Sequence, residues 1–203
     1  ALGKEARKRG VAGRVPDWGQ TYVELEQGAD EIRMYSDELI PGVLQTDDYA
    51  RALISTWPNP SSEDIDERLA YRVQRRRRLL AEPAPDLWVV LGEAALYRLV
   101  AGREGLWNQL RWLRELADHR SVSLQILPFS VGEHIALGAG FSILSFREPR
   151  TTFVYYEGLT GATYLDRPPH TEVYSAVFQR LLVAAANERE SKRMLDERIK
   201  ELS

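Results

Sequence analysis

The sequence contains no cysteine among its 203 residues. A disulfide framework, a thiol nucleophile and a cysteine-based zinc site are therefore all excluded. Its three histidines are His119, His134 and His170, and none lies three or four residues from another. Because transition-metal sites gather several imidazole or thiolate ligands, we expect no metal site and no cofactor.

The usual signatures of catalysis are also missing. There is no G-x-S-x-G elbow and no phosphate loop, and the turn at 138–140 lacks the third glycine and the following helix that dinucleotide binding requires. Glu133 and His134 are adjacent, and adjacent side chains rarely point the same way, so they make a poor acid–base pair. We therefore expect a binding protein and not an enzyme.

Long apolar runs and an excess of positive charge are absent as well. No uninterrupted apolar stretch approaches the roughly 20 residues that cross a bilayer. Lys and Arg number 27 against 30 Asp and Glu, a net charge of -3, so the chain has no general attraction for phosphate backbones. These features, with the lack of cysteine, fit a cytoplasmic protein that does not itself bind nucleic acid.

The residues that are present predict an α+β fold in one domain over residues 18–203. Hydrophobic residues make up 44% of the chain, enough for a substantial core. Apolar periodicity and capping signals predict helices near 18–29, 47–55, 61–80, 104–118, 168–184 and 187–202. Alternating or β-branched runs predict strands near 31–35, 87–91, 122–126, 141–146 and 151–156.

The order of these elements indicates how the sheet is built. Short connections between the later strands favour antiparallel pairing, and no regular βαβ alternation is evident. We therefore predict a mainly antiparallel sheet packed with helices, with helical N- and C-terminal segments. The last helix is highly charged with a narrow apolar stripe, which we expect to pack within the protein and at a possible homodimer contact.

One dense basic cluster consists of Arg72 and the run Arg75–Arg78. Successive helix positions are about 100° apart, so consecutive arginines surround the helix and cannot all face one phosphate backbone. A solvated helix end explains them, because the helix dipole favours cations there. A contact with DNA or an acidic partner remains the alternative, in support of a separate DNA-binding domain.

Two stretches combine polar and apolar residues in a way that can build a binding site. In 31–52 the polar residues surround a Pro-Gly turn, and they are Arg33, Tyr35, Gln45, Thr46, Tyr49 and Arg51. Such a mixture forms a pocket wall or a tightly packed strand–turn–helix corner, and both remain open. In the second stretch Tyr155, Tyr156 and Tyr164 flank Glu157, where cross-strand packing is the simpler explanation.

The same stretches carry a family resemblance. EIRMYSDELIPGVLQTDDYARALI, with LWVVLGEAALYR, VSLQILPFSVGEHIALGAGFSILSF and FVYYEGLTGATYLD, resembles a large actinobacterial family of domains of unknown function. These domains follow an XRE-type helix-turn-helix domain in antitoxin-like transcriptional regulators. ALGKEARKRG resembles the linker of that family, so we expect residues 1–17 to be a linker from a missing N-terminal helix-turn-helix domain.

The resemblance implies a regulatory domain that binds a partner or a signal, with DNA contacted only through the missing domain. The expected partner is a small companion protein encoded nearby, in an antitoxin-like module. The positions that match the family signature are Arg33, Pro41, Gly42, Gln45, Thr46, Tyr49, Ala50 and Arg51, with Glu157 in the second stretch. His134 matches a recurrent family position too.

Two further functions remain open. In one, the domain senses a small anionic molecule in a pocket between residues 33–51 and the strands around 155–164, with Arg33 and Arg51 binding the anion. In the other, the domain is an unrecognised enzyme in which Glu157 and His134 act as general acid and base.

Overall fold

The computed structural model describes residues 17–203, so the predicted linker lies outside the described residues except for Asp17. The helices of this part are α2 (Asp17–Gly28), α3 (Asp47–Ile54), α4 (Ser62–Leu79), α5 (Gly102–Leu116), α6 (His170–Ala184) and α7 (Glu188–Leu202). The strands are β1 (Glu31–Ser36), β2 (Asp86–Gly92), β3 (Val122–Leu127), β4 (Phe141–Phe146), β5 (Thr151–Gly158) and β6 (Gly161–Leu165). Single 3-10 turns are η1 (Gly42–Leu44), η2 (Glu93–Leu96) and η3 (Phe129–Val131).

Local sequence signals explain where several helices begin. Ser61 and Asp64 form a capping box at the start of α4: the Asp64 N–H donates to Ser61 Oγ over 3.0 Å, and the Ser61 N–H donates to Asp64 over 3.1 Å. At the start of α7, the Asn187 side chain accepts the Glu190 N–H over 3.0 Å. Thr46 is the residue before α3, but its side chain does not cap the helix, and its hydroxyl instead donates to Gln109 Oε1 over 3.3 Å.

The fold is α+β as predicted, but its sheet is mixed and not mainly antiparallel. The strand order is β3-β2-β1-β4-β5-β6, with β1, β2 and β3 parallel and β4, β5 and β6 antiparallel. The prediction failed because β1 reaches β2 through α3 and α4, and β2 reaches β3 through α5. These are the long helical crossovers that parallel pairing needs.

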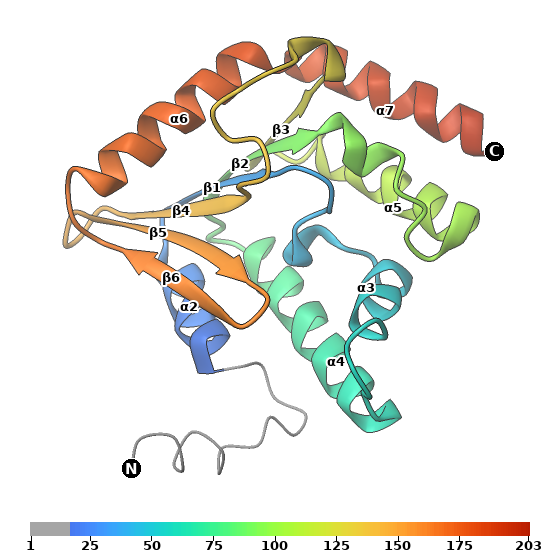
Figure 1. The fold of residues 1–203 in the computed structure, drawn as a ribbon, viewed down its shortest axis with the longest axis horizontal. Helices are drawn as coiled ribbons and strands as arrows, with labels where there is room; N and C mark the ends of the chain where they lie inside the picture. Colours follow the sequence, from blue (N-terminus) through green and yellow to red (C-terminus); the bar gives the residue numbers. More distant parts are fainter. Residues whose placement is uncertain (1–16) are drawn as a thin grey trace.

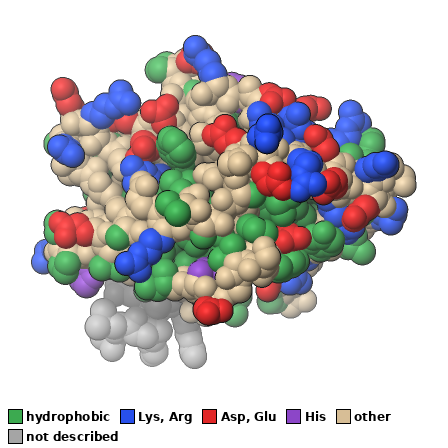
Figure 2. All heavy atoms as spheres, turned by 90° about the horizontal axis from the view of Figure 1, so that it is seen from above, with side chains coloured by type: hydrophobic (Ala, Val, Ile, Leu, Met, Phe, Trp, Pro, Cys, Tyr) green, Lys and Arg blue, Asp and Glu red, His purple; other side chains and the backbone are tan. Residues whose placement is uncertain are grey.

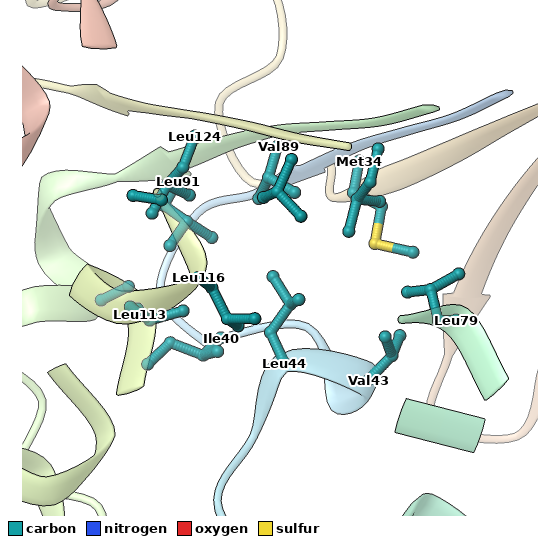
Figure 3. Close-up of a cluster of buried hydrophobic side chains, with 14 of the residues drawn as sticks. Met34, Ile40, Val43, Leu44, Leu79, Val89, Leu91, Leu113, Leu116 and Leu124 are labelled. Carbon is teal, nitrogen blue, oxygen red and sulfur yellow. The ribbon is translucent and has the colours of Figure 1, made fainter. Parts of the chain in front are cut away.

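Helices cover the two faces of the sheet unequally. One face packs on α6 through a small cluster that includes Tyr35, Phe141 and Phe178. The other face holds the larger core, against α2, η1, α3, α4 and α5 (Figure 1). In this core, Met34, Val89 and Leu91 of the strands point toward η1 and α5 (Figure 3).

The predicted apolar stripe of α7 is used inside the domain. Leu195 and Leu202 are buried in the larger core, with Met194 and Ile199 packed against it. Over the end of the molecule that carries α7, acidic and basic side chains are intermingled (Figure 2). Among the described residues, no helix is both long and apolar enough to span a membrane.

Candidate functional site

A cleft of about 500 Å³ opens at the edge of the sheet where the parallel half meets the antiparallel half. Its floor is formed by the end of β1, the start of β4 and the end of β5, at 34–36, 140–142 and 155–157. Its walls are α4, η1 with the chain around it, the end of α3, and the first turns of α2. In mixed α/β sheets, ligands bind beyond the carboxyl ends of parallel strands, and β1 ends here.

Three arginines of α4 line this cleft: Arg68, Arg72 and Arg75. Their spacing of four and three residues places them on one face of the helix. Glu157 is the only acidic residue among the described residues that line the cleft, which contain no lysine, aspartate or histidine. The cleft is therefore locally positive in a chain whose net charge is -3.

Arg75 already has an acidic partner. Its Nε donates to Glu26 of α2 over 3.1 Å, and Nη2 donates to the other carboxylate oxygen over 2.5 Å. Burial alone would lower the pKa of Arg75, but the Glu26 carboxylate outweighs it and the pKa is raised. The guanidinium also lies 5.3 Å from the ring centroid of Tyr22. Arg75 therefore joins α4 to α2 at the back of the cleft.

Arg72 has no comparable partner. Its guanidinium donates to Gln45 Oε1, a neutral acceptor, and no ion pair involves it in the described part of the chain. Burial lowers the pKa of Arg72 to about 10, repulsion by Arg75 adds to the effect, and attraction by Glu157 only partly opposes it. A positive charge is thus held in the cleft without full compensation.

Arg68 is the second cation of the cleft that has no ion pair with any described residue. Its guanidinium lies 5.3 Å from the ring centroid of Trp57, in a cation–π arrangement. Its Nε is buried and has no hydrogen-bond partner within residues 17–203. Buried polar atoms of proteins are nearly always hydrogen-bonded, so this atom has unused donor capacity beside the cleft.

The signature residues of 31–52 mainly position this cleft. Gln45 is buried; its Nε2 donates to the Ile40 carbonyl over 2.7 Å while its Oε1 accepts from Arg72. The fully buried Tyr49 hydroxyl accepts the N–H of Ile40 over 3.4 Å. The Thr46 N–H donates to Gln109 of α5 over 2.7 Å. These contacts fix η1 and aim the Arg72 guanidinium.

The two arginines expected to bind the anion lie elsewhere. Arg33 pairs with Glu31 over 2.7 Å, and its alternating strand position is on the α6 face with Tyr35. Arg51 pairs with Asp66 over 2.8 Å on the exposed surface between α3 and α4. Neither lines the cleft, so the cations of the cleft come from α4 instead.

Glu157 and His134 are not brought together. Glu157 accepts the Tyr155 hydroxyl over 2.9 Å at the cleft, on the α2 side of the sheet, where Tyr155 and Tyr22 stack. His134 lies edge-on to Tyr35, whose ring packs in the α6-side cluster. The sheet separates the two side chains, which removes the geometric reason for an acid–base pair.

Sequence reasoning did not identify Arg68. It placed Arg72 and Arg75 in a basic cluster interpreted as a solvated helix end, with a contact to DNA or an acidic partner as the alternative. Only Arg77 and Arg78 of that cluster are exposed, whereas Arg76 pairs with Asp47 of α3 over 2.9 Å. The usable signal was the spacing 68, 72 and 75, which marks one helix face, and not the consecutive run. No sequence signal pointed to Trp57 or Glu26.

A second surface lies in the loops that follow β1, β2 and β3. We call it the apolar loop surface, and its exposed residues are Leu39, Tyr97, Leu99, Phe129, Ile135 and Leu137. Tyr97 and Phe129 have ring centroids 6.2 Å apart. The loops are also tied together, because Gly138 N–H donates to Asp37 over 2.6 Å and Phe129 N–H donates to Glu93 over 2.7 Å.

The fold and the cleft together define an α+β domain with a mixed sheet and an arginine-lined cleft. Comparison with known proteins gives the family: residues 20–197 match the family described as Domain of unknown function (DUF5753), and the chain belongs to it. Neither a curated protein nor a solved structure matches the chain.

Proposed function

We propose that this domain is the ligand-binding part of a bacterial transcription regulator and that its cleft binds an anionic group. The domain acts in the cytoplasm and controls a helix-turn-helix domain that precedes it in the chain, as the resemblance to antitoxin-like XRE-type regulators implies. For such control, the ligand must bind two states of the regulator with different affinities, because equal affinity shifts nothing.

The observation that carries the proposal is the pair Arg68 and Arg72. Both guanidiniums lie at the cleft without an ion-pair partner among the described residues, and one has a buried donor with no acceptor. An uncompensated cation in a partly desolvated cleft is costly, and an anion would remove that cost. Guanidinium groups bind carboxylate or phosphate through paired hydrogen bonds.

The test is a thermal-shift screen of inorganic phosphate, carboxylates and nucleotides against the wild type and two variants. A ligand that binds the native state raises its apparent stability, so at least one anion should raise the Tm of the wild type. The increase should vanish in Arg72→Met and persist in Arg77→Met, which removes an exposed arginine of the same helix. An increase that survives Arg72→Met would place the anion elsewhere.

The apolar loop surface favours a second candidate function, the binding of the small companion protein. Phe129, Ile135 and Leu137 are 63%, 66% and 59% exposed, on loops held in place by Asp37 and Glu93. Clustered, exposed apolar side chains on an ordered surface are typical of protein interfaces.

Co-purification with the protein encoded beside this one tests the second candidate. Phe129→Ser should reduce the amount of companion protein retained, because aromatic side chains contribute much of the binding energy at interfaces. Leu159→Ser is the matched control, since Leu159 is 91% exposed on the β5–β6 turn, far from these loops in sequence. Equal loss in both variants, or no retention by the wild type, would refute this candidate.

A further inference from the structure

Resting on the proposed function, we infer that the ligand of the cleft is a phosphate monoester of a ring-bearing group that also carries hydroxyl or amine donors. Nucleoside monophosphates belong to this class. The inference concerns three parts of the cleft: the Arg68–Arg72 pair, the Trp57 indole and the Glu157 carboxylate.

The Arg68–Arg72 pair matches the charge of a phosphate monoester. The two residues are one helical turn apart on the same face of α4, so both can reach one anion. Together they carry two positive charges with no ion-pair partner among the described residues. A phosphate monoester carries between about 1.5 and 2 negative charges at pH 7 and has three acceptor oxygens. A single carboxylate would leave one of the two cations uncompensated.

Trp57 provides a surface for a ring next to this anion position. Its side chain is 42% exposed, lines the cleft, and has the Arg68 guanidinium 5.3 Å from its ring centroid. An exposed indole beside this anion position offers a stacking face for a flat group, because nucleic-acid bases stack on aromatic side chains.

Glu157 provides the acceptor for donor groups of the ligand. Its carboxylate accepts a hydrogen bond from the Tyr155 hydroxyl over 2.9 Å, and the two carboxylate oxygens can accept further hydrogen bonds. The same charge repels an anion, so the phosphate belongs on the arginine side of the cleft and the hydroxyl or amine donors belong on the Glu157 side. An anionic ligand without hydroxyl or amine donors would leave the Glu157 side of the cleft unused.

Isothermal titration of the 203-residue chain with four compounds tests the inference. The compounds are phenyl phosphate, benzoate, inorganic phosphate and adenosine 5′-monophosphate. Phenyl phosphate should bind at least about tenfold more tightly than benzoate, because a phosphate monoester carries more negative charge and one more acceptor oxygen than a carboxylate. Arg68→Gln should weaken both organic phosphates by about tenfold, whereas Arg77→Met should leave them unchanged.

Two further variants separate the parts of the site. Trp57→Ala should weaken phenyl phosphate but not inorganic phosphate. Glu157→Gln should lower the affinity for adenosine 5′-monophosphate relative to phenyl phosphate, which has neither hydroxyl nor amine. Because Trp57 and Glu157 are partly exposed, these variants should fold, and urea unfolding of each variant verifies it.

The failures of this inference and of the proposed function give different results. If benzoate binds as tightly as phenyl phosphate and Arg72→Met abolishes that binding, the cleft binds anions but does not select a phosphate ester. That result would overturn the inference and leave the proposed function standing. If Arg68→Gln and Arg72→Met both bind the phosphates as tightly as the wild type, the phosphate does not bind at the Arg68–Arg72 pair, and the inference is wrong. Absence of binding by all four compounds, together with silence in the anion screen, would overturn the proposed function as well.

Discussion

Replacing Arg72 by methionine should stabilise the empty domain while abolishing anion binding. Burial and the neighbouring Arg75 lower the pKa of Arg72 to about 10, more than two units below the usual value for arginine. At about 1.4 kcal/mol per pKa unit, holding this charge in the cleft costs about 3 kcal/mol. The cost is present at every pH below about 10, because Arg72 is charged throughout that range.

The expected net gain is smaller than this cost. The variant leaves Gln45 Oε1 without its donor, which costs about 1–2 kcal/mol, and the partly exposed Arg72 retains some hydration. Methionine matches the length and much of the volume of the aliphatic part of arginine. We therefore expect a net stabilisation of about 1 kcal/mol, which corresponds to a Tm increase of about 2–4 °C in a domain of this size.

Urea unfolding, followed by far-UV circular dichroism, measures this difference. The midpoint should rise in Arg72→Met with an unchanged slope, and Arg77→Met should stay within about 0.5 kcal/mol of the wild type. Saturating anion should then stabilise the wild type and Arg77→Met but not Arg72→Met. A loss of more than about 1 kcal/mol in Arg72→Met would refute the reasoning, because it would mean that the charge is compensated where it stands.

Three other changes have defined outcomes. Glu26→Gln should destabilise the domain by about 3 kcal/mol in urea unfolding, because it leaves buried Arg75 unpaired. Glu24→Gln, a change at an exposed residue of the same helix, should have little effect. Equal losses of stability in the two variants would contradict the role of the Glu26–Arg75 pair. Gln109→Leu should cost about 2–4 kcal/mol, because the Leu44 carbonyl and Thr46 N–H lose their partner, and Asn108→Leu serves as the control. Hydrogen bonds from Ser61 lower the pKa of Asp64. The ionised carboxylate therefore stabilises the fold fully above about pH 4, and this stabilisation is lost as the pH falls through the lowered pKa. The difference in unfolding free energy between wild type and Asp64→Asn should shrink from pH 6 to pH 3, and a constant difference would show that the Asp64 charge does not contribute.

Most elements could be predicted from the sequence, but their pairing could not. The helix expected over 61–80 is α4 (Ser62–Leu79), and the strand expected over 31–35 is β1 (Glu31–Ser36). Periodicity and capping are local, so they locate such segments well. Whether β2 lies beside β1 depends on how α3 and α4 cross over the sheet, which is a property of tertiary packing.

In the candidate site, too, local features could be predicted from the sequence but long-range contacts could not. Gln45 and Tyr49 stood out as polar residues in an apolar segment, and both hold η1 against the cleft. Gln109 accepts the Thr46 N–H although it lies 63 residues from Thr46 in the sequence. No local sequence pattern predicts such a contact. The arginines of α4 were visible as charge, but their direction depends on which face of the helix meets the sheet.

The lining of the cleft comes from six separate stretches of chain, between Gly19 and Glu157. A molecule held there would cross-link α2, η1, α3, α4 and two halves of the sheet in a single step. Amide hydrogen exchange should therefore slow far beyond the atoms that touch the ligand, including the helix nearest to the N-terminal segment. Filling the cleft would in this way stiffen elements beyond its lining, and α2 would respond together with α4, because the ion pair of Glu26 with Arg75 joins these two helices.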